Sequence, residues 1–144
     1  MAKFKQGYYK VINRDKYIGD VDKVFYRSSY ELKFMIWCDN QPSVLRWNSE
    51  ELIVPYIKPT DKRQHRYMVD FYIEYKNTKN QIIKEAIEIK PHAQTKPPRR
   101  SKGKSGLYQQ VTYAINIAKW QAAAKWCKKR GVTFRLITEK QLFK

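Results

Sequence analysis

The spacing of apolar residues changes period several times along the chain and predicts an alternation of helices and strands. From Ser28 onward apolar residues recur at helical spacing, which places Leu32, Met35 and Ile36 on the buried face. A serine hydroxyl can accept from the free N–H groups of a first helical turn, so we expect the helix to begin at Ser28. It should end before Pro42, which cannot continue a helix.

Shorter runs rich in β-branched and aromatic residues follow this helix and predict strands. Two of them cover 44–47 and 52–57, and Pro55 marks the second as an edge strand because proline donates no ladder hydrogen bond. Two more, 66–75 and 82–90, are separated by a polar turn and predict a β-hairpin. The rest of the chain is expected to be organised around this hairpin.

A long helix is predicted over 107–130, ended by Gly131. Its buried stripe is expected to contain Val111, Ala114 or Ile115, Ala118 and Ala122. A last strand at 132–137 and a short terminal helix complete the pattern. This order of elements predicts an α/β domain with a central mixed β-sheet flanked by helices.

The length of 144 residues favours a single domain, 1–144. Residues 1–24 are polar and basic and are expected to form an extended N-terminal arm with little structure of its own. Residues 91–105 contain almost nothing apolar and are expected to form a mobile basic loop.

The charge distribution indicates a polyanionic partner. The net charge is +17, and no Asp or Glu occurs between Ile89 and Thr138. A membrane surface could attract such a segment, but no long apolar run accompanies it, so DNA is favoured over a membrane. The contacts are expected to be mostly with backbone phosphates. The candidate DNA-binding residues are Lys96, Arg99, Arg100, Lys102, Lys104 and Lys119.

The predicted hairpin carries an Asp on one strand and a Glu-x-Lys on the other. Glu88 and Lys90 project to the same face of their strand, and antiparallel partners whose numbers sum to 156–158 place Asp70 opposite residues 86–88. Asp70 and Glu88 could then share one Mg²⁺ for phosphodiester hydrolysis, with Lys90 beside it to orient the attacking water. A solvated strand face with alternating charges is the alternative, but apolar neighbours on both sides of each acid favour a buried pair.

The ordered motifs resemble the PD-(D/E)XK nuclease superfamily. Within it they are similar to the TnsA-like branch, which includes transposon end-cleaving nucleases and the head-completion nucleases of tailed phages. Val69 stands where the motif usually has proline, a change that removes no metal ligand. The motifs that carry the resemblance lie at 25–34, 53–57, 65–71, 87–91, 116–120, 126–127 and 134–139.

The resemblance implies a restriction-endonuclease-like core and a catalytic set. Asp70, Glu88 and Glu31 would bind Mg²⁺, for which Mn²⁺ could substitute, and Lys90 would be the catalytic lysine. Glu31 has an alternative role, because Ser28-x-x-Glu31 is also a capping box. Gln110 and Asn116 are possible supporting residues, with solvated helix polarity as their alternative.

The expected function is therefore a Mg²⁺-dependent DNA endonuclease that processes packaged DNA during phage head completion. Phage head or neck proteins are expected partners, and the expected location is the cytoplasm of a bacterial host and then the virion. Two alternatives stay open: a non-catalytic DNA-binding or head-joining protein on a nuclease fold, and a junction resolvase or transposase-type nuclease. Oligomeric state does not follow from the sequence.

Overall fold

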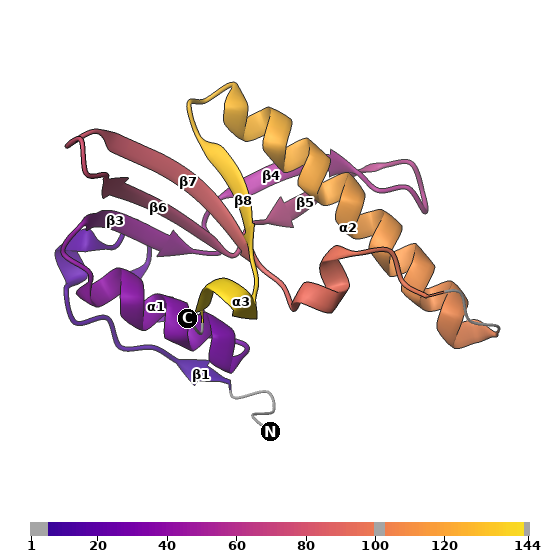
Figure 1. Cartoon of the computed structure of the whole chain (residues 1–144), viewed down its shortest axis with the longest axis horizontal. Helices are drawn as coiled ribbons and strands as arrows, with labels where there is room; N and C mark the ends of the chain where they lie inside the picture. The colour runs from indigo at the N-terminus through magenta and orange to yellow at the C-terminus, as the bar shows by residue number, and fades with distance from the viewer. Residues whose placement is uncertain (1–5, 100–102, 143–144) are drawn as a thin grey trace.

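A four-stranded mixed sheet forms the centre of the computed structural model, which describes residues 6–99 and 103–142 (Figure 1). The strands lie in the order β3 (Val44–Ser49), β6 (Phe71–Lys76), β7 (Ile82–Ile89) and β8 (Thr133–Ile137). β8 is parallel to β7, and the other neighbours are antiparallel. This is the mixed sheet that the sequence predicts, and it is consistent with a restriction-endonuclease-like core.

One helix lies on each face of the sheet. α1 (Ser29–Asn40) covers one face, and α2 (Lys104–Lys128) crosses the other to connect the parallel strands β7 and β8 (Figure 1). The short α3 (Glu139–Leu142) packs beside α1. None of the helices among the described residues is long and apolar enough to cross a membrane.

The predicted hairpin is divided between two sheets. Its first strand breaks at Val69 and Asp70, so that β5 (Gln64–Met68) pairs with β4 (Ile53–Ile57) in a separate ribbon while β6 joins the main sheet. Pro55 lies in β4, which is paired on one side only, as expected of an edge strand. Phe71 pairs with Ile87, a sum of 158, so the predicted register is correct.

The first hydrophobic core lies between α1 and the sheet, and contains Phe34, Met35, Trp47 and Phe71. Met35 is buried as predicted, but Ile36 is 44% exposed and Phe34 takes its place. The helix is rotated relative to the prediction because its inward stripe also includes the fully buried Asp39.

Asp39 attaches the N-terminal segment to the domain. Its carboxylate accepts hydrogen bonds from Tyr9 Oη (2.6 Å), Ile12 N (2.8 Å) and Asn13 N (2.9 Å). From Lys16, Nζ donates to three carbonyl oxygens at the end of α1, at 2.8 to 3.1 Å. Residues 6–24 are thus packed against α1, in contrast to the extended arm that the sequence predicts.

Short regular elements accompany this packing. β1 (Gly7–Tyr8) pairs with β2 (Phe25–Tyr26), and two 3₁₀ turns, η1 (Arg14–Lys16) and η2 (Val21–Lys23), lie between them. The polar composition of this segment hides its structure, which is fixed by hydrogen bonds to α1 and by isolated apolar residues, Val11, Tyr17 and Val24, that are buried in the first core.

The second core lies under the C-terminal half of α2, where Trp120, Ala123 and Cys127 pack against Ala86 and the β4–β5 ribbon. The predicted stripe is wrong at its N-terminal end, since Val111 is exposed. The reason is that the N-terminal half of α2 extends beyond the sheet (Figure 1). The preceding basic segment contains a 3₁₀ turn, η3 (His92–Thr95).

Candidate active site

Asp70 occupies the point where the chain passes from the ribbon to the main sheet. Its carbonyl oxygen accepts from Glu50 N (3.1 Å), and the preceding residue, Val69, donates to Leu52 O (3.0 Å). The carboxylate oxygen Oδ2 accepts from Ile89 N at 2.8 Å. These bonds fix the carboxylate beside the end of β7, although Asp70 itself is not part of a strand.

Glu88 lies on β7 and shares with Ala86 the face toward α2. Its side chain is buried, and Tyr67 Oη donates to Oε1 at 2.7 Å. Lys90 follows two residues later with its Nζ 3.7 Å from Glu88 Oε2, as expected for residues on one strand face. Its backbone N–H donates to Ile137 O (3.0 Å), which ties the lysine to the end of β8.

The two carboxyl groups have too few donors to offset their burial. Burial and then the charge of Glu88 raise the pKa of Asp70 well above its usual range, against the hydrogen bond from Ile89. Burial also raises the pKa of Glu88, despite the Tyr67 hydroxyl and the Lys90 charge. A pair of buried oxygen ligands that repel each other fits a hard divalent cation, which would relieve both effects.

Glu31 points its carboxylate toward the start of α1. Ser28 Oγ accepts from Glu31 N (3.2 Å), which is one of the two bonds of a capping box, and Glu31 Oε1 accepts from Arg27 N (3.1 Å) instead of from the N-cap N–H of Ser28. Burial raises the pKa of Glu31, and the charges of Glu50 and Glu88 contribute to the rise. Within residues 6–99 and 103–142 no three His, Cys, Asp or Glu side chains are close enough to hold one metal ion. In this conformation Glu31 therefore caps α1 and acts on Asp70 and Glu88 only through its charge.

Lys119 brings a second cation to the carboxylates from α2. Its half-buried Nζ lies 5.5 Å from the ring centroid of Tyr67 and 5.8 Å from that of Tyr56. Burial lowers the pKa of Lys119, and the charge of Glu88 opposes this shift. Tyr67 thus contacts both sides of the site, through its hydroxyl to Glu88 and through its ring to Lys119.

Comparison with known proteins assigns the family. The sequence-family model of the TnsA-like endonuclease N-terminal domain matches residues 41–139. The chain belongs to this TnsA-like endonuclease family. It is also 35% identical over 133 residues to the "Head completion nuclease" of Enterobacteria phage T4, an alignment that covers 88% of this chain and 86% of the relative. No solved structure shows significant similarity.

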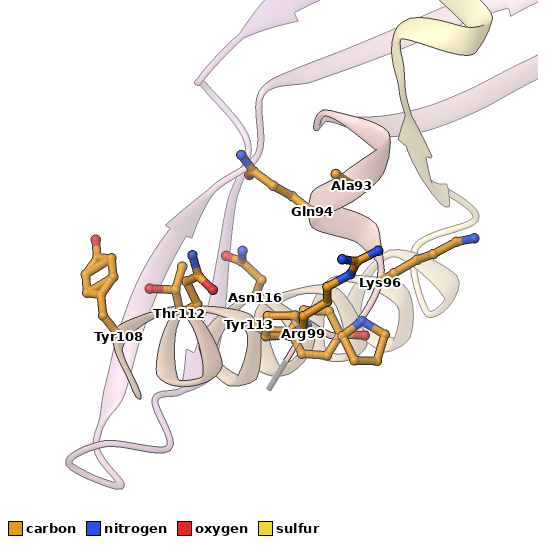
Figure 2. Close-up of a pocket in the computed structure, with 11 residues that line it drawn as sticks. Ala93, Gln94, Lys96, Arg99, Tyr108, Thr112, Tyr113 and Asn116 are labelled. Carbon is orange, nitrogen blue, oxygen red and sulfur yellow. The ribbon is translucent and has the colours of Figure 1, made fainter. Parts of the chain in front are cut away.

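Membership in the TnsA-like family makes the chain a nuclease, with DNA as its substrate class. The candidate DNA-binding residues lie in different places around the site. Lys96, Arg99 and Asn116 line a groove between the η3 segment and α2 (Figure 2). Lys104 is exposed at the first turn of α2. Arg100 and Lys102 lie outside the described residues.

Gln110, a possible supporting residue, is exposed, and its neighbour Gln109 rather than Gln110 lines the groove. The exposure favours the alternative, a solvated helix glutamine.

Two residues near the site of this TnsA-like nuclease are absent from the sequence-based set. Tyr67 was missed because the sequence gives no sign that β5 leaves the hairpin and passes beside Glu88. Glu50, which follows β3, forms an ion pair with Arg27 close to Glu31. No local motif distinguishes Glu50 from other turn glutamates.

Proposed function

We propose that this chain is a Mg²⁺-dependent DNA endonuclease that acts on packaged DNA during completion of a phage head, and that Mn²⁺ can replace Mg²⁺. The observation that carries the proposal is the buried carboxylate of Glu88 with the partly buried Asp70 as its electrostatic neighbour and Lys90 beside it, in a member of an endonuclease family. Similarity to the head completion nuclease of phage T4 supports the biological step.

In this proposal Asp70 and Glu88 would hold the cation, and Glu31 would complete the acidic set by releasing the Arg27 N–H from which it accepts in this conformation. When bound, the ion neutralises charge that develops on the phosphate and makes a water molecule more acidic. Lys90 orients that water from the exposed side of Glu88 and accepts or returns a proton. Lys119, whose Nζ lies over the rings of Tyr56 and Tyr67, binds a nonbridging oxygen of the scissile phosphate.

The basic residues after β7 position the DNA. Lys96, Arg99, Arg100, Lys102 and Lys104 would contact backbone phosphates, because lysine and arginine bind phosphate without reading sequence. Weak sequence preference and strong salt sensitivity follow. We further propose that the whole chain is one nuclease domain, present in the host cytoplasm and later in contact with phage head or neck proteins.

Nicking of supercoiled plasmid tests this function. The wild-type protein is expected to nick DNA with Mg²⁺ or Mn²⁺ and not with EDTA. Lys90→Met should reduce the rate by about 10²- to 10⁴-fold, the usual contribution of a positioned acid or base. Lys84→Met, at an exposed position of the same strand, is the matched control and should retain full activity.

Equal DNA cleavage by wild type and Lys90→Met, or cleavage in EDTA, would contradict the proposal. A protein that binds DNA but never cleaves it would instead be the structural DNA-binding alternative. A panel of linear, branched and supercoiled DNA separates the remaining possibility, since preferential cutting of branched DNA indicates a junction resolvase.

A further inference from the structure

A groove separate from the carboxylate pair lies between the η3 segment and the N-terminal half of α2 (Figure 2). Its volume is about 590 Å³, within the range of small-molecule and nucleotide sites. Tyr108, Thr112 and Asn116 recur every four residues and line it from one face of α2. This groove is formed by the part of α2 that extends beyond the sheet (Figure 1).

The lining of the groove combines three kinds of chemistry. Tyr108 and Tyr113 supply aromatic rings on which a base can stack. The amides of Gln94 and Asn116 can each donate and accept hydrogen bonds, as the edge of a base requires. Lys96 adds a cation suited to a phosphate, and Figure 2 shows Gln94 reaching from the η3 turn and Asn116 from α2.

Electrostatics favour an anionic ligand here. Lys96 and Arg99 both line the groove, and none of the described residues that line it is an Asp or Glu. Tyr108 is 70% exposed, so its ring is available for stacking without any rearrangement of the core. A purely apolar ligand would leave these cations and amides without partners.

The chain connects both walls of the groove to the catalytic set. Gln94 follows Lys90 by four residues across η3, and Asn116 precedes Lys119 by one turn of α2. A DNA strand whose scissile phosphate lies between Lys90 and Lys119 would therefore bring a neighbouring nucleotide to Gln94 and Asn116. Stacking on the exposed ring of Tyr108 needs an accessible base face, which a base inside a duplex does not offer, so the bound base has to be unpaired.

We propose that this groove binds an unpaired nucleotide next to the scissile phosphate, so that the preferred substrate is DNA with a single-stranded end or gap. The position of this nucleotide next to the cleaved bond rests on the proposed nuclease function. Binding of the base is independent of the metal, because it uses rings, amides and cations outside the carboxylate pair.

The test measures binding in EDTA, without cleavage. The probes are a blunt duplex and the same duplex with a short single-stranded extension that carries a fluorescent adenine analogue. Wild type should bind the extended duplex more tightly and quench the analogue by stacking. Tyr108→Ala should weaken binding of the extended duplex by about fivefold or more, from the usual strength of one base–aromatic stack, and leave the blunt duplex unchanged.

Tyr8→Ala is the matched control, because Tyr8 is 72% exposed and lies in β1 on the α1 side. Asn116→Ala is a second variant that tests the amide without changing the aromatic surface. Equal affinity of wild type for both duplexes, or equal loss in Tyr8→Ala and Tyr108→Ala, would overturn the proposal. So would full competition by a free mononucleotide with no effect of the extension, which indicates a nucleotide site unrelated to the substrate.

Failure of the two proposals can be told apart. If the extension is bound and quenched but plasmid is never cleaved with Mg²⁺, the groove stands as a DNA site and the nuclease function fails. If plasmid is cleaved while Tyr108→Ala and Asn116→Ala bind both duplexes as wild type does, the nuclease stands and the groove proposal fails.

Discussion

Two buried acidic centres in this protein differ in how their charge is satisfied. Asp39, on the α1 side, is fully buried and accepts from two backbone N–H groups and the Tyr9 hydroxyl. Burial opposes its ionisation, but these hydrogen bonds outweigh it and lower the pKa of Asp39. Asp70 and Glu88, at the end of β7, have fewer donors and repel each other, and their pKa values are raised.

The difference separates a structural acid from a functional pair. At Asp39 the protein itself supplies the compensating groups, so the carboxylate holds the N-terminal segment on α1. At Asp70 and Glu88 the compensation is incomplete, and a cation would complete it. Burial of a carboxylate therefore does not by itself indicate a cation site. A shortage of hydrogen-bond donors and counter-charges around the carboxylate does.

The largest expected effect follows from removing one charge of the pair. Asp70→Asn keeps the shape of the side chain but weakens cation binding, so plasmid cleavage with Mg²⁺ should fall by at least about 100-fold. Asp61→Asn, in the exposed loop between β4 and β5, is the control and should cleave normally. Undiminished cleavage by Asp70→Asn would remove the proposed distinction between the two centres.

Asp39→Asn should act on stability instead of chemistry. The amide keeps one acceptor oxygen but loses the charge that the donors surround, at a cost of about 1.5 to 3 kcal/mol in the free energy of unfolding. Urea unfolding measures this cost, and plasmid cleavage under native conditions should stay within a few-fold of wild type. A loss of cleavage in a fully folded Asp39→Asn protein would contradict the structural role.

The pH dependence of stability should differ in sign between the centres. A raised pKa in the folded state gives stability that is present below the unfolded value, about 4, and is lost as pH rises through the folded value. In EDTA, the stability of wild type relative to Asp70→Asn should therefore fall as pH increases from about 4 toward neutrality. The pKa of Asp39 is lowered, so the stability of wild type relative to Asp39→Asn should instead fall as pH drops below about 4. The free energy of unfolding is measured with urea at each pH. If the difference between wild type and each variant does not change with pH, the assigned directions of the two pKa shifts are wrong.

A smaller effect is expected at Lys119, whose Nζ lies over the rings of Tyr56 and Tyr67. Lys119→Met should weaken binding of all duplex sequences alike and reduce the slope of log affinity against log salt by about one. Lys125→Met, exposed on the same helix, controls for general charge loss. Identical salt slopes for the two variants would show that Lys119 makes no special phosphate contact.

Much of the fold could be predicted because it follows from local periodicity. The helix after Ser28, the strands and the register of Phe71 with Ile87 all follow from the alternation of apolar residues and from a short polar turn. The same alternation predicts Glu88 and Lys90 on one strand face, and in the structure Lys90 Nζ lies 3.7 Å from Glu88 Oε2.

The parts that could not be predicted depend on contacts between distant segments. The division of the hairpin at Asp70 arises from pairing of β5 with β4, a choice that a strand pattern does not encode. Tyr67 meets Glu88 only because of that division. The N-terminal segment is held by hydrogen bonds to Asp39 and by isolated apolar residues that reach the first core, and its polar composition alone therefore suggests a loose arm.

Calorimetric titration of Mg²⁺ tests the central claim most directly, namely that Asp70 and Glu88 form an incomplete acidic pair that binds a cation. At neutral pH the wild-type protein and Asp39→Asn should bind the ion with similar affinity, and Asp70→Asn should bind it much more weakly. Equal Mg²⁺ affinity in wild type and Asp70→Asn, or no binding by wild type, would contradict the account.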